Sequence, residues 1–82
     1  MQYVVPMFES ERGWGSKIDG YAGPFKDQAS AVTFEQAYNR ENNNELRVPD
    51  YYILALDPVP YTSQKCDYRT TVAGKEYNDK AS

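Results

Sequence analysis

The sequence predicts an α+β domain in which one helix packs on one face of a small, mainly antiparallel sheet. Two strand-like segments joined by a glycine-rich turn come first, and one helix-like segment with an apolar stripe follows. A nearly continuous apolar segment then predicts a third strand. The order ββαβ is typical of a two-layer fold with a three-stranded sheet. A chain of 82 residues has room for one such domain.

The first two strands are predicted over residues 2–9 and 16–22. Both segments contain β-branched or aromatic residues, and the intervening residues 10–15 are rich in turn formers. In that turn, Gly13 and Gly15 allow positive φ on both sides of Trp14. The two strands would therefore close a hairpin.

Pro6 bears on the order of the strands. It has no N–H for a ladder hydrogen bond, which favours an edge position for the first strand or a bulge within it. An edge position predicts the order 1-2-3, which we prefer because it also places the apolar third strand towards the middle. A bulge at Pro6 would permit the order 2-1-3.

The helix is predicted over residues 27–41. Asp27 is a good N-cap because its carboxylate can accept hydrogen bonds from unpaired N–H groups of the first turn. Helical spacing gives a narrow apolar stripe that would lie on the sheet, formed by Ala31, Phe34, Ala37 and Tyr38.

The third strand is predicted over residues 50–57, and the domain over residues 1–61. Residues 62–82 are predicted to form a polar C-terminal extension, in which residues 67–72 are compatible with a short fourth strand. Residues 74–82 contain few apolar side chains, so we expect this end to be mobile and dispensable for folding.

The composition excludes several classes of function. The chain has no His and a single Cys, which excludes His-based catalytic triads, zinc and haem sites and a disulfide scaffold. The glycines match no phosphate-binding loop, so we expect no cofactor. The net charge is −3 without a basic stripe, and no apolar run is long enough for a membrane span. We therefore expect no direct nucleic-acid binding and no membrane association.

The predicted hairpin carries the candidate site: Glu9, Glu11, Arg12, Trp14 and Lys17. Glu9 and Glu11 are two residues apart in a strand, so they share one face. Such a pair can do acid–base work or bind a cation with help from Asp19. Alternatively the two are solvated charges balanced by Arg12 and Lys17, which we favour because exposed pairs of this kind are common.

Trp14 and Arg12 are the residues that interfaces use most often as anchors. Trp14 either projects outward as such an anchor or folds back on the core, because a small domain needs its large aromatics. The eight Tyr residues are compatible with stacking on single-stranded nucleic acid, but that mode needs a positive groove, so core packing is favoured.

The segment Phe8–Gly15, Phe-Glu-Ser-Glu-Arg-Gly-Trp-Gly, resembles the opening of a group of short tailed-phage and prophage proteins. The resemblance covers about residues 3–57 and includes Ala31, Phe34, 39–44 and 49–52. It implies a phage accessory protein located in the host cytoplasm. The ββαβ arrangement also looks like that of small phage proteins that inhibit host enzymes.

The leading hypothesis is therefore a phage accessory protein that binds and inhibits a host protein without catalysis, as a monomer or weak homodimer. An acidic nucleic-acid mimic is the alternative, and it requires carboxylates arranged in rows. A small ligand- or metal-binding module is the third hypothesis.

Overall fold

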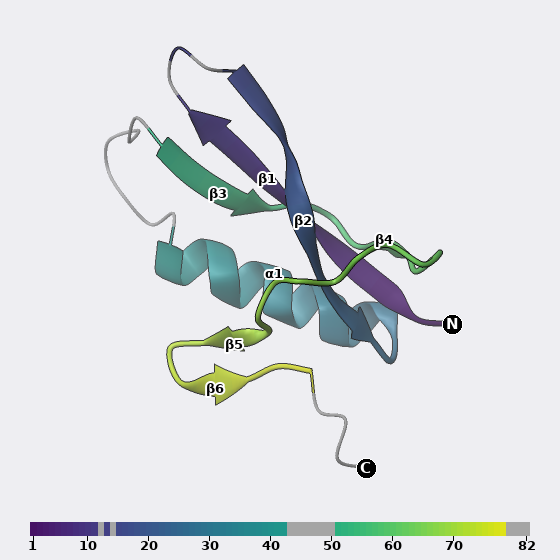
Figure 1. The fold of residues 1–82 in the computed structure, drawn as a ribbon. Helices are drawn as coiled ribbons and strands as arrows, with labels where there is room; N and C mark the ends of the chain where they lie inside the picture. The colour runs from purple at the N-terminus through teal and green to yellow at the C-terminus, as the bar shows by residue number, and fades with distance from the viewer. Residues whose placement is uncertain (12, 14, 43–50, 79–82) are drawn as a thin grey trace.

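The computed structural model describes residues 1–11, 13, 15–42 and 51–78, and it confirms the predicted α+β class. One helix lies against a sheet of mainly antiparallel strands, and a small second sheet lies beside the helix (Figure 1). The elements are β1 (Tyr3–Glu11), β2 (Gly15–Phe25), α1 (Gln28–Asn42), β3 (Tyr51–Ala55), β4 (Val59–Pro60), β5 (Thr71–Val72) and β6 (Lys75–Glu76).

The order of the main sheet is β2-β1-β3, with β4 also paired to β1. The preferred order 1-2-3 is therefore wrong, and the alternative 2-1-3 is confirmed. Pro6 can lie in the central strand because its backbone faces the gap between β3 and β4, the two strands that pair with the same side of β1. The Leu56 N–H donates to the Pro6 carbonyl oxygen at 2.9 Å, so the backbone of Pro6 turns towards the β3–β4 side. There β3 has ended at Ala55 and β4 has not begun, so a missing N–H costs little.

The pairing of β1 with β2 is irregular on both sides of Pro6. The register shifts between Tyr3 and Val5 and again between Met7 and Phe8. Such shifts are β-bulges or local irregularities, and they do not come from the missing N–H of Pro6, because the backbone of Pro6 faces the β3–β4 side. The register runs evenly again from Phe8 to Glu11, so the hairpin end is a regular antiparallel ladder.

Helix α1 begins as the sequence predicts. The Ser30 N–H donates to Oδ1 of Asp27 at 2.8 Å, and this backbone hydrogen bond is the main cause that lowers the pKa of the Asp27 carboxyl. The stripe is also confirmed, because Ala31, Phe34 and Ala37 are buried and Tyr38 packs against the core.

The core lies between α1 and one face of the sheet. Val5 and Met7 of β1 belong to it, and Phe34 of the helix packs on Phe25 with ring centroids 5.4 Å apart. Neighbouring residues along β1 point to the opposite face. Phe8 therefore lies on the face turned away from α1.

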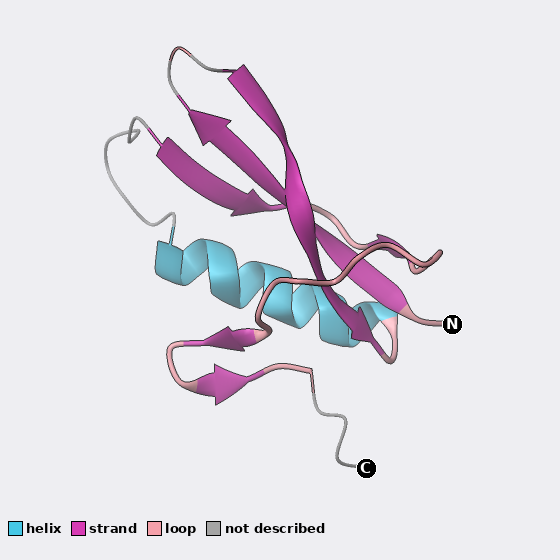
Figure 2. Cartoon of the chain, in the orientation of Figure 1, coloured by secondary structure: helices cyan, strands magenta, loops and turns pink. Residues whose placement is uncertain are grey.

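The C-terminal segment contributes to this core, which the sequence pattern did not predict. Val72 is 5% exposed, and the ring of Tyr77 packs edge-on against Phe34 with centroids 6.4 Å apart. Figure 2 shows the β5–β6 hairpin beside the helix. This contact runs against the expectation that residues 74–82 are mobile and dispensable for folding, because the half-buried ring of Tyr77 holds residues 74–78 against Phe34. Residues 79–82 lie outside the described part.

Residues 67–72, whose sequence is compatible with a short fourth strand, make two separate contacts. Tyr68 makes an isolated parallel bridge to Ala22 of β2, and its N–H donates to the Tyr21 carbonyl oxygen at 3.2 Å. Thr71–Val72 pairs instead with Lys75–Glu76.

Candidate functional site

The free end of the β1–β2 hairpin is the main candidate site. Figure 1 shows this end on the opposite side of the molecule from the β5–β6 hairpin. Glu9 pairs with Lys17, and Glu11 pairs with Gly15. Directly opposed residues of an antiparallel pair lie on the same face. The structure thus brings Glu9, Glu11 and Lys17 together, as the sequence predicts.

These side chains line a shallow hollow of about 270 Å³, together with Gly15 and Ser16. Two carboxylates and one ammonium group meet there at the surface. Arg12 and Trp14, the two other predicted site residues, lie outside the described residues.

The third carboxylate of the possible cation site at the hairpin has another partner. Asp19, the carboxylate that would assist Glu9 and Glu11, accepts a hydrogen bond from the Tyr68 hydroxyl instead. Among the described residues, no group of three or more Cys, Asp or Glu side chains is placed to hold a metal ion.

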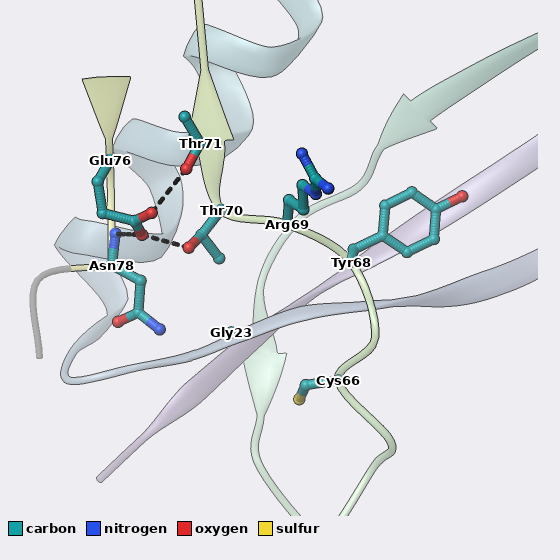
Figure 3. Close-up of a pocket in the computed structure, with 8 residues that line it drawn as sticks. All are labelled: Gly23, Cys66, Tyr68, Arg69, Thr70, Thr71, Glu76 and Asn78. Atoms are coloured by element: carbon teal, nitrogen blue, oxygen red, sulfur yellow. Dashed lines mark hydrogen bonds between the residues drawn. The ribbon is translucent and has the colours of Figure 1, made fainter. Parts of the chain in front are cut away.

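A second hollow, of about 410 Å³, lies between β2 and the C-terminal hairpin (Figure 3). Within it the Glu76 carboxylate accepts hydrogen bonds from the Thr71 hydroxyl at 2.7 Å, from the Asn78 N–H at 2.8 Å and from the Thr70 hydroxyl. Such a carboxylate is occupied in holding its own hairpin together. Cys66, which also lines this hollow, is half-buried, and its thiol lies 3.5 Å from the Gln64 carbonyl oxygen.

One carboxyl pair was missed by sequence reasoning. Partial burial and a hydrogen bond with Asp57 raise the pKa of Glu35 to about 7. Glu35 lies on α1 and Asp57 follows β3, so the pair joins the helix to the sheet layer. One turn further along α1, the Asn39 side chain hydrogen-bonds the backbone of Ala55. A spacing of sixteen or more residues leaves no local pattern from which either contact could be predicted.

The described carboxylates are spread over several elements. Asp27 and Glu41 lie near opposite ends of α1, whereas Glu9 and Glu11 lie on the hairpin. This spread gives no support to a nucleic-acid mimic, which needs a continuous line of negative charge.

The tyrosines follow the core-packing expectation where they are described. Four of the six tyrosines whose side chains are described pack against the core, namely Tyr3, Tyr38, Tyr68 and Tyr77, whereas Tyr21 is half-buried outside it and Tyr61 is 37% exposed. The side chains of Tyr51 and Tyr52 lie outside the described part.

In the described ranges, α1 is too short and too polar to cross a membrane. Comparison with protein-family models, with curated proteins and with solved structures finds no match to this chain.

Proposed function

We propose that this chain is a small, non-enzymatic phage accessory protein that binds a host protein through its β1–β2 hairpin end and inhibits it. The observation that carries the proposal is the exposure of that end. Every residue from Gly15 to Asp19 is exposed, and so is Glu11. Ile18 is 42% exposed, although large aliphatic side chains are normally buried.

The mixed charges of Glu9, Glu11 and Lys17 suit a protein partner better than a nucleic acid. Two carboxylates beside one ammonium group repel a phosphate backbone but can pair with a mixed protein surface. The phage assignment and the host location follow from the resemblance of Phe8–Gly15 to short phage proteins.

Affinity capture from host lysate with Trp14→Ala as the comparison tests the proposal. The wild-type chain should retain at least one host protein that the variant loses. An interface Trp anchor is typically worth about 2 kcal/mol or more, which corresponds to about thirtyfold in affinity. Gln36→Ala, on the exposed face of α1, is the matched control and should capture the same protein as the wild type.

A melting temperature is measured on each bait, because a Trp that packs on the core would weaken binding only through unfolding. Capture of no host protein by the wild-type chain would contradict the proposal. Equal capture by a stable Trp14→Ala protein would move the site away from the hairpin.

A further inference from the structure

Along the two outer edges of the sheet, some backbone groups are covered by other parts of the chain and others are not. On the β3 edge, the Asn39 amide occupies both backbone groups of Ala55 at 2.9 Å. On the β2 edge, Tyr68 covers Tyr21 and Ala22 through its parallel bridge and its N–H. In the described part of the chain, Gly15–Asp19 has no strand partner other than β1, and only its last residue, Asp19, is contacted by Tyr68, whose hydroxyl donates to the Asp19 carboxylate.

The register shows which backbone groups face this uncovered edge. Since Pro6 turns its carbonyl oxygen to the β3 side, alternation turns the backbone of Glu9 towards β2. Lys17, opposite Glu9, therefore bonds to β1. Its neighbours Ser16 and Ile18 present their N–H and C=O groups to the open edge.

The side chains beside this edge define what an added strand would meet. Ile18 lies opposite Phe8, and Phe8 lies opposite Leu54, so the three form an apolar row across the sheet. The row is on the face turned away from α1, and Phe8 and Leu54 are only half-buried. A fourth strand would extend the row with one more apolar residue.

On the other face the edge presents Lys17. A second copy of this chain, paired antiparallel about Lys17, would place two ammonium groups directly opposite each other, which is unfavourable. Edge lysines protect sheets against self-pairing in this way. An acidic residue in the added strand would instead complement Lys17.

Resting on the proposed function, we infer that the Gly15–Asp19 edge of β2 binds an extended segment of the partner protein as an added strand, with an apolar side chain beside Ile18 and an acidic one opposite Lys17. Main-chain hydrogen bonds to Ser16 and Ile18 hold the segment, and the two side-chain positions select it. Tyr68 already uses the far end of the same edge in this manner.

A capped peptide of alternating valine and glutamate, as long as the edge, is the probe. Titrated into isotope-labelled protein, it should give saturable shifts of the Ser16 and Ile18 amide signals. The matched peptide with lysine in place of glutamate should bind at least tenfold more weakly. Equal binding of the two peptides would overturn the charge assignment at Lys17.

Three variants locate the binding on the edge. Ile18→Pro removes one outward N–H and should abolish the shifts, whereas Ile18→Val keeps that N–H and should retain them. Lys17→Glu, at an exposed position, should reverse the preference in favour of the lysine peptide. Amide signals of α1 report whether each variant stays folded, and Lys17→Glu tests the inference even if Ile18→Pro does not fold.

Three further outcomes separate this inference from its alternatives and from the function on which it rests. Host capture that survives in a folded Ile18→Pro protein would overturn the edge and leave the proposed function standing. Sedimentation that shows a wild-type dimer, lost in Ile18→Pro, would make a second copy the occupant and overturn the partner strand. Peptide binding without any host capture would support the edge and count against the proposed function.

Discussion

The side chain of Asn39 acts as a strand partner for Ala55. Its Nδ2 donates to the Ala55 carbonyl oxygen at 2.9 Å, and the Ala55 N–H donates to its Oδ1 at 2.9 Å. Ala55 is only 2% exposed, so water does not replace these bonds easily. One amide therefore fixes the helix to β3 and covers its edge at Ala55.

Replacing Asn39 should leave the N–H and C=O groups of Ala55 without these hydrogen-bond partners and so destabilise the fold. We expect Asn39→Ala to lower the free energy of unfolding by about 1–3 kcal/mol for each buried group left unsatisfied. Urea denaturation measures it. Asn42→Ala is the control, because Asn42 donates to the Tyr38 carbonyl oxygen of its own helix at 2.9 Å in an exposed hydrogen bond, and it should change stability little. Similar losses in the two variants would contradict the role given to Asn39.

The pair of Glu35 and Asp57 should make stability depend on pH. The pKa of Glu35 is raised from 4.5 to about 7, so the folded state holds this proton more tightly than the unfolded state. Its stabilising contribution is full below pH 4.5 and is lost as pH rises through about 7. We therefore expect Glu35→Gln to gain stability relative to the wild type as the pH rises from 5 to 8. The difference between the two melting temperatures measures this gain.

Glu41→Gln, at an exposed position of the same helix, is the control for that pH series. It removes the same charge without touching Asp57. A pH dependence that survives unchanged in Glu35→Gln would assign it to another group.

Phe34 should be among the most sensitive positions of the chain. It is fully buried, and its ring meets those of Phe25, Tyr38 and Tyr77. We expect Phe34→Ala to lower the free energy of unfolding by about 3–5 kcal/mol. Chemical denaturation against Gln36→Ala on the exposed helix face measures it. Cooperative unfolding at nearly wild-type stability would contradict the core described above.

Truncation of the chain should separate the C-terminal hairpin from the residues beyond it. Ending the chain after Ala73 removes β6 and Tyr77, which packs on Phe34. Each kcal/mol lost lowers the melting temperature of a small domain by about 4–8 °C, so calorimetry should detect this change. Ending it after Asn78 keeps every described contact and should leave the melting temperature unchanged. Identical melting of the two truncated chains would show that the hairpin adds nothing.

Elements with a local pattern were determined by the sequence alone. The spacing of Ala31, Phe34 and Ala37 fixes one helix face, and Asp27 fixes its start, since capping and periodicity act within a few residues. The hairpin pattern also brought Glu9, Glu11 and Lys17 to one place, because a short turn sets the register of neighbouring strands.

Only the tertiary structure decided which strand is central and what covers the edges. Pro6 can lie in the central strand because the position of its missing N–H faces the gap between β3 and β4. That gap is formed by residues some fifty positions further along the chain. The bonds of Asn39 to Ala55 and of Tyr68 to Tyr21 likewise join distant segments. The packing of the whole chain selects these partners, so no local sequence pattern predicts them. For the same reason, the open Gly15–Asp19 edge of β2 can be identified only in the folded structure.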